Sequence, residues 1–203
     1  DAYFYPFSIE QKHHIYSCTK SIMSALIGIA IDKGYIQNVS QPITDFFPDK
    51  VLANMSDLKK SITLENLLIM ASGLRCGGWA GFFDMWNSDD WAQYVLDLPM
   101  AGTPGEKFEY CDGVSYLLSV IIQNTTKMKT LDFARKHLFE PLGILDVEWL
   151  RSPQGIDAGY GDMWLKPHDM AKIGWLYLNM GRWDSTQIVP SAWVEISTRG
   201  HID

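Results

Sequence analysis

The hydrophobic residues of this chain are most densely grouped between positions 22 and 31, where only Ser24 and Gly28 interrupt them. A helix that is apolar on nearly every side is normally enclosed by the rest of its own protein. Gly34 can supply the left-handed residue that ends such a helix, and Ser17 lies where the first exposed turn should begin. The pattern therefore predicts a buried helix at the centre of the core, with a serine at its N-terminal end.

Apolar residues elsewhere recur at the three- to four-residue spacing of shorter helices. One such stretch follows Thr63, which can cap it with Asn66 in the capping-box position, and it ends before Gly73. A long helix is expected after Asp112, which looks like its cap. The other expected helices cover residues 89–96, 131–138 and 167–180, and a last one begins near position 192.

Residues 76–87 combine large aromatic side chains with glycines. The plainer interpretation is a surface loop folded back on the core. The functional interpretation is a mobile aromatic wall over a pocket, because ligand sites pair apolar linings with a few polar groups and often lie under loops. In that case Trp79, Phe82 and Trp86 are the candidate substrate contacts.

Composition is that of a soluble globular domain, with 203 residues of which 47% are hydrophobic and 20% charged. The net charge of -7 and the pI near 5.1 argue against nucleic acid or an anionic membrane as partner, and favour a small uncharged or cationic substrate. The longest apolar run is about half the length that crosses a bilayer, so no membrane span is predicted. The first residues lack an initiator Met and the features of a signal peptide, which leaves localisation open.

The cysteines and histidines predict neither a disulfide scaffold nor a metal site. Cys18, Cys76 and Cys111 are few and scattered, and at least one must be unpaired. If all three are unpaired, a cytoplasmic location is favoured. The histidines show no ligand spacing, so neither a metal nor any other cofactor is expected.

Candidate chemistry lies at the start of the central helix. Lys20 is three residues after Ser17 and emerges on the same face, which places an amine beside a hydroxyl. The Ser-x-x-Lys pattern alone is weak, because about one match is expected by chance, and an ordinary capping serine followed by an exposed lysine is the competing interpretation. The second match, from Ser56 to Lys59, lies in a polar stretch and is interpreted as a solvated turn.

Further motifs follow in order along the chain. They are the stretch 62–74, Pro104-Gly105 ahead of Tyr110-Cys111-Asp112, and Pro141-Leu142-Gly143. With Ser17 and Lys20, these motifs resemble the class C β-lactamase and penicillin-binding-protein-like family of serine hydrolases. The resemblance is nearest to the branch of carboxylesterases and 6-aminohexanoate-oligomer hydrolases.

The resemblance implies an α+β fold in which a mostly helical lobe lies beside an antiparallel sheet. It also implies that Ser17 attacks a carbonyl of an ester or amide, that Lys20 and Tyr110 handle its proton, and that water hydrolyses the acyl-enzyme. One departure is Asp112, where the family usually has Asn. A carboxylate there would hold Lys20 protonated, so we hypothesise that Lys20 is a fixed cation and Tyr110 the proton acceptor.

A second departure concerns the ends of the chain. The third family motif, Lys- or His-x-Gly on a strand, should come well after residue 203, and the opening strands also lack a counterpart. The sequence is therefore expected to be one domain over residues 1–203, incomplete at both ends, with most of the flanking sheet strands missing. A non-catalytic binding or sensor module that keeps the fold is the alternative to a hydrolase.

Overall fold

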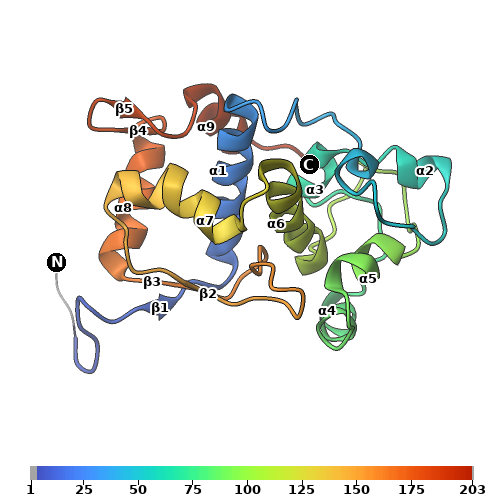
Figure 1. Ribbon diagram of the computed structural model, residues 1–203, viewed down its shortest axis with the longest axis horizontal. Helices are drawn as coiled ribbons and strands as arrows, with labels where there is room; N and C mark the ends of the chain where they lie inside the picture. The colour runs from blue at the N-terminus through green and yellow to red at the C-terminus, as the bar shows by residue number, and fades with distance from the viewer. Residues whose placement is uncertain (1–3, 203) are drawn as a thin grey trace.

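The long apolar helix stands at the centre of the molecule in the computed structural model, which describes residues 4–202 (Figure 1). It is α1 (Thr19–Asp32), and one 3-10 turn, η1 (Tyr16–Cys18), leads into it. Most of its side chains are buried. Gly34 follows its end with a φ of +75°. The predicted central helix and its glycine stop are confirmed.

Two helices from distant parts of the chain pack against α1. They are α6 (Asp112–Thr126) and α9 (Ser191–Ser197). The approach of α9 is close, because a side-chain carbon at Gly28 would lie 2.4 Å from the indole of Trp193. Protein interiors leave no room for such an overlap. Glycine at position 28 is therefore what allows this indole to lie on the central helix.

The other helical elements surround α1 and α6 (Figure 1). Those before α6 are η2 (Ile43–Phe46), α2 (Asp57–Lys60), α3 (Leu64–Leu68), α4 (Gly78–Trp86) and α5 (Trp91–Asp97). Those after it are α7 (Thr130–Ala134), the π-helical turn η3 (Arg135–Phe139), η4 (Glu140–Leu142) and α8 (Pro167–Leu178). The helices expected from apolar spacing are all present, and Thr63 and Asn66 form the predicted capping box.

Short antiparallel strands lie near the N-terminal end of α1 (Figure 1). The sheet has the order β1-β3-β2, built from β1 (His13–His14), β2 (Glu148–Trp149) and β3 (Met163–Leu165). Its pairing continues past β1, since Ile15 donates its N–H to the carbonyl of Met163 at 2.9 Å. The sheet therefore holds the backbone just before Ser17. A hairpin of β4 (Arg182–Trp183) and β5 (Thr186–Gln187) follows α8. The predicted α+β class, mostly helical, is confirmed.

The aromatic stretch after Cys76 is a helix, α4, so the interpretation of residues 76–87 as a loop is wrong. Gly77 and Gly78 have φ values of +71° and +56° and turn the chain into the helix. A side-chain carbon at Gly81 would lie 1.9 Å from the carbonyl oxygen of Cys76. These glycines, which suggest a loop in the sequence, are instead required for a sharp turn and a tightly packed first helical turn.

Two of the three cysteines are paired, which corrects the expectation that they are unpaired. A disulfide joins Cys76 to Cys111, and Cys18 is free and exposed. The argument for a cytoplasmic location therefore no longer holds, because it depended on unpaired cysteines. The paired residues are 35 positions apart, and only the fold shows that they meet.

The second Ser-x-x-Lys stretch is also more than a solvated turn. Ser56 caps α2 by accepting from the backbone N–H of Lys59 at 3.2 Å. The Lys59 side chain is fully buried and donates to the carbonyls of Ala53 at 2.8 Å and Leu96 at 2.9 Å. This burial lowers the pKa of its amine. The hydroxyl of Ser56 and the amine of Lys59 thus have separate structural roles.

Candidate active site

Three side chains meet at the N-terminal end of α1. The hydroxyl oxygen of Ser17 lies 2.5 Å from the phenol oxygen of Tyr110. The ammonium of Lys20 donates to both oxygens, at 3.2 Å to Ser17 and 2.8 Å to Tyr110. Ser17 and Lys20 are neighbours in the sequence, whereas Tyr110 comes 93 positions after Ser17. The fold therefore brings together the three groups that the sequence proposes as catalytic.

Lys20 has more acceptors than protons. Besides Ser17 and Tyr110, its ammonium donates to Asp112 Oδ1 at 2.7 Å and to the backbone carbonyl of Tyr160 at 2.6 Å. An ammonium has three N–H donors and no acceptor. A carboxylate and a carbonyl can only accept, so these two contacts match a protonated lysine. The remaining N–H is shared between the serine and the phenol, as expected for a fixed cation beside them.

The backbone just before Ser17 has a rare conformation. Tyr16 has a φ of +48°, in the left-handed region that residues other than glycine seldom occupy. Such a residue costs about 1–3 kcal/mol and persists where surrounding contacts hold it. Here the ring of His14 lies 4.0 Å from that of Tyr16, and the Thr19 hydroxyl donates to the Tyr16 carbonyl at 2.7 Å. This turn sets the direction in which the Ser17 side chain points at the N-terminal end of α1.

Tyr110 and Asp112 reach Lys20 from the junction before α6. Cys111 is the N-cap, with extended φ and ψ of -144° and 109°, and Asp112 is the first helical residue. The expectation that Asp112 is the cap is therefore wrong by one position. The expectation that both side chains lie at an element junction is confirmed. A carboxylate in the first turn is also favoured by the dipole of α6.

A cavity of about 430 Å³ lies beside this cluster. Ser17, Tyr110 and Asp112 line part of it, and the rest of the lining is mostly apolar. Among the lining residues in the described part of the chain, Asp112 is the one charged side chain, and it is paired with Lys20. The other lining residues are Cys76, Gly78, Trp79, Gly81, Phe82, Met85, Tyr94, Val95, Leu98, Cys111 and Gly113.

The three aromatic residues proposed as substrate contacts are placed differently. Trp79 and Phe82 on α4 line the cavity. Phe82 also packs edge-on against the ring of Tyr160, with a centroid distance of 5.3 Å. Trp86 lies one turn further along and packs against Phe82 at 6.0 Å and Trp91 at 5.0 Å. Two of the three therefore face the cavity, and the third supports the wall.

A larger cavity, of about 590 Å³, is lined by residues of α1, α3 and α9. Its lining includes Ser24, Met70, Phe108, Trp193 and His201. Ser17, Lys20 and Tyr110 are not among them, and the lining lacks the serine, amine and phenol that meet beside the smaller cavity. A catalytic site needs a nucleophile and a proton acceptor within reach of the substrate, and only the smaller of these two cavities has them. We therefore take the smaller cavity as the candidate active site.

Two other tyrosines near the site differ from Tyr110 in their surroundings. Burial raises the pKa of Tyr116 to about 12, and it raises the pKa of Tyr160 as well. Both phenols therefore keep their protons near neutral pH. Tyr110 is 46% exposed and is the phenol in contact with Ser17. It is the tyrosine placed to exchange a proton with the serine.

The sequence does not indicate that the backbone carbonyl of Tyr160 accepts a hydrogen bond from Lys20. Tyr160 lies in the loop between β2 and β3, which approaches α6 closely because Gly159 has no side chain. A side-chain carbon there would lie 2.6 Å from the carbonyl of Ser115. Glycines on both sides of Tyr160 are the available signal, and they indicate close packing without showing that Lys20 is the partner.

Replacing Asp112 with Asn is expected to lower kcat/KM for ester hydrolysis about tenfold, the effect of weakening one charge-assisted hydrogen bond. The amide keeps the size of the carboxylate and an acceptor for Lys20, but it removes the negative charge of the ion pair. The measurement is kcat/KM for a short-chain 4-nitrophenyl ester. An unchanged kcat/KM would contradict a role of Asp112 in holding Lys20 at the site.

Comparison with known proteins places this chain in a family. The sequence profile of the family described as Beta-lactamase matches residues 3–198. The chain belongs to the beta-lactamase family. This is a family of serine hydrolases, and its members act on small-molecule substrates. The resemblance expected from the sequence motifs is therefore confirmed.

Within the family, the chain is 24% identical to a 6-aminohexanoate-dimer hydrolase of Paenarthrobacter ureafaciens, over 93% of this chain and 51% of that protein. Its fold is similar to that of a Bacillus anthracis protein thought to be a 6-aminohexanoate-dimer hydrolase, with a TM-score of 0.82 and 19% identity over 96% of this chain and 55% of that one. It is also similar to a D-amino acid amidase of Ochrobactrum anthropi complexed with L-phenylalanine amide, with a TM-score of 0.69 and 22% identity over 93% and 60% of the two chains.

The chain spans about half the length of the curated relative that it matches. Within residues 4–202, no helix is long and apolar enough to cross a membrane. Over the same residues, no cluster of His, Cys, Asp and Glu side chains has the composition to hold a metal ion.

Proposed function

We propose that this protein is a serine hydrolase that cleaves an ester or amide bond of a small molecule through an acyl-enzyme on Ser17. The observation that carries the proposal is the contact of the Ser17 hydroxyl with both Tyr110 and Lys20 beside a cavity. A nucleophile in hydrogen-bond reach of a proton acceptor, which is itself held by a third group, is the arrangement that activates a serine. Membership of a serine hydrolase family supports the same class of reaction.

In the proposed reaction, the Ser17 oxygen attacks the substrate carbonyl carbon while its proton moves to the Tyr110 oxygen. Tyr110 acts from its phenolate form, which the Lys20 ammonium stabilises from 2.8 Å. The proton then passes from Tyr110 to the leaving alcohol or amine as the bond to the carbonyl carbon breaks. Water repeats the sequence on the acyl-enzyme, which releases the acid and restores Ser17.

The negative charge that forms on the substrate carbonyl oxygen also needs a donor. We propose the backbone N–H of Ser17, which lies where η1 leads into the N-terminal end of α1. The first N–H groups of a helix lack partners within it, and the dipole there favours negative charge. A donor of this kind typically contributes about 10²–10³-fold in rate.

The cavity favours a substrate with an apolar or aromatic group next to the reacting carbonyl. Trp79, Phe82 and Met85 contribute to its lining, and the charge of Asp112 is already neutralised by Lys20. A charged substrate group would lose water in this cavity without gaining a partner. The D-amino acid amidase with a similar fold was solved with the amide of an aromatic amino acid, which is consistent with this class of substrate.

The proposal is tested by labelling with a fluorophosphonate, by mass spectrometry of the labelled residue, and by hydrolysis of short-chain 4-nitrophenyl esters. The native protein is expected to be labelled at Ser17 and to turn over. Ser17→Ala is expected to lose both activities, about 10⁶-fold in kcat by the precedent of a serine nucleophile. Ser56→Ala is the matched control, because it removes the serine of the second Ser-x-x-Lys stretch and is expected to keep both.

The same experiment distinguishes the alternative function. Label on Ser17 without turnover would indicate an acyl-binding sensor and would overturn the hydrolase proposal. Label on another serine, or equal turnover by Ser17→Ala, would overturn the assignment of the nucleophile. An unlabelled native protein would indicate that the fold is kept without either activity.

Truncating Phe82 to Ala is expected to raise KM about tenfold for an ester with an arylalkyl acyl group, with little change in kcat. The reason is that burial of an aromatic ring against the substrate contributes about 1.5 kcal/mol to ground state and transition state alike. Trp175→Ala is the control, because Trp175 is exposed and belongs to α8, which lies away from α4 (Figure 1). A KM for the arylalkyl ester that is the same in Phe82→Ala as in Trp175→Ala would contradict a substrate contact at Phe82.

A further inference from the structure

The Cys76–Cys111 disulfide is attached directly to the segment that carries the site. Cys111 lies between Tyr110 and Asp112, both of which contact Lys20. Both sulfur-bearing residues line the cavity, and each is only 5% exposed. The disulfide is therefore a neighbour of the reacting groups rather than a link on the outer surface.

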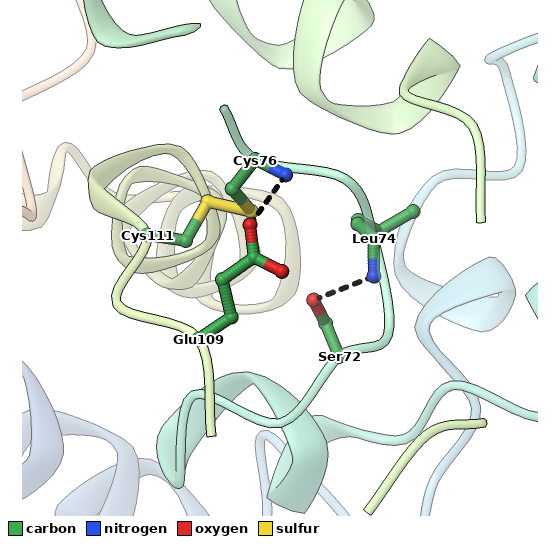
Figure 2. Close-up of a disulfide and its surroundings, with 5 residues drawn as sticks. All are labelled: Ser72, Leu74, Cys76, Glu109 and Cys111. Atoms are coloured by element: carbon green, nitrogen blue, oxygen red, sulfur yellow. Dashed lines mark hydrogen bonds between the residues drawn. A yellow bond between two sulfur atoms is a disulfide. The ribbon is translucent and has the colours of Figure 1, made fainter. Parts of the chain in front are cut away.

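The Tyr110 ring is exposed and little enclosed by packing, so apart from its hydrogen bonds to Ser17 and Lys20 its position depends on its backbone. That backbone lies outside any helix or strand, and Cys111, the next residue, is extended. Besides the disulfide, Glu109 ties this backbone down, because its N–H donates to the carbonyl of Met70 at 2.8 Å and its carboxylate accepts from the N–H of Cys76 at 3.0 Å. Figure 2 shows this carboxylate and the disulfide side by side, both joined to Cys76.

The other end of the disulfide is fixed by the segment before α4. Leu74 pairs with Met100 in an antiparallel bridge, and the Arg75 N–H donates to the carbonyl of Pro99 at 2.8 Å. Gly81 packs on the Cys76 carbonyl, so α4 and its cavity-lining rings start from the same anchor. The disulfide thus joins the Cys76 segment, whose backbone is fixed by hydrogen bonds, to the segment that carries the exposed phenol of Tyr110.

We propose that the Cys76–Cys111 disulfide is a positioning element of the active site, which keeps Tyr110 in reach of Ser17 and is opened by a dithiol reductant. This inference rests on the proposed hydrolase function. In the reductive step, the dithiol transfers two electrons and two protons to the S–S bond, which becomes two thiols, and the reductant becomes a cyclic disulfide. The opened protein keeps its helices but acylates Ser17 more slowly.

The test compares oxidised and dithiothreitol-reduced protein in a Cys18→Ser background, so that titrated thiols come only from the disulfide. The rate of fluorophosphonate labelling is expected to fall about ten- to hundredfold on reduction, which is the effect of misplacing a catalytic group by a fraction of an ångström to one ångström. Reoxidation is expected to restore the rate. The Cys76→Ser/Cys111→Ser double variant is expected to behave like the reduced protein without any reductant.

The Tyr110→Phe variant in the same Cys18→Ser background shows whether the disulfide acts by positioning the Tyr110 phenol or by supporting the fold in general. If the disulfide acts through the phenol, reduction has little further effect on the residual labelling rate of this variant. An equal fall in both backgrounds would overturn the proposal, as would unchanged labelling of the reduced protein with both thiols titrated. Loss of the far-ultraviolet helix signal on reduction would overturn it too, because the disulfide would then be a general stabiliser. If the oxidised protein is neither labelled nor active, the proposed hydrolase function fails first, and this inference with it.

Discussion

Replacing Tyr110 with Phe is expected to lower kcat for ester hydrolysis by about 10²–10⁴-fold, the range contributed by a positioned acid–base group. The change removes the oxygen that lies 2.5 Å from the Ser17 hydroxyl and 2.8 Å from the Lys20 ammonium, while it keeps the ring. KM is expected to change little, because the lost oxygen acts on the proton and not on the bound substrate. The measurement is a full rate–concentration curve for a short-chain 4-nitrophenyl ester.

Tyr35→Phe is the matched control for this prediction. Tyr35 is also partly exposed, and its ring packs edge-on against Phe133 at 6.0 Å, a contact that Phe can keep. Its kcat is expected to equal that of the native protein. A Tyr110→Phe variant with more than a tenth of native kcat would show that the proton of Ser17 leaves by another route.

Replacing Lys20 with Met is expected to lower kcat/KM by about 10²–10³-fold or more, as the loss of a preorganised charge next to the reacting groups does. Met keeps much of the unbranched length of the side chain, so the packing of α1 is largely preserved. The variant loses the donor to Ser17 and Tyr110, and it leaves Asp112 without its ion pair. Both the acylation rate by fluorophosphonate and steady-state turnover should fall.

Lys60→Met is the control for the change in net charge, since Lys60 is exposed and forms only a surface pair with Asp57. It is expected to have native rates. Thermal unfolding of both variants shows whether a loss of activity comes from a loss of structure. A Lys20→Met protein that is folded and acylates at the native rate would remove the lysine from the mechanism.

The parts of the site that the sequence predicts are those set by local rules. The central helix follows from an unbroken apolar run, and the neighbourhood of Ser17 and Lys20 follows from one turn of that helix. The capping box of Thr63 and Asn66 is likewise a three-residue pattern. In these cases the interacting groups are close in the sequence, so periodicity is enough to place them.

The parts that escaped prediction depend on contacts between distant segments. Cys76 and Cys111 are separated in the sequence by α4, α5 and the loop to α6, and only the fold brings them together. The carbonyl of Tyr160 is a backbone group, and any residue could supply it, so no side-chain motif marks it. Lys59 is buried and donates to the carbonyls of Ala53 and Leu96, although its own polar neighbours in the sequence suggest an exposed side chain. Patterns of neighbouring residues do not predict contacts that depend on tertiary packing.

The left-handed backbone at Tyr16 has a consequence for attempts to make this protein more heat-resistant. Glycine is relaxed in that conformation, so selection for stability alone would favour changes that release the strain ahead of Ser17. Such changes would also leave the position of the Ser17 hydroxyl less fixed. Stability and turnover are therefore opposed at this one peptide, and a thermostable variant found without an activity screen would tend to be a slower enzyme.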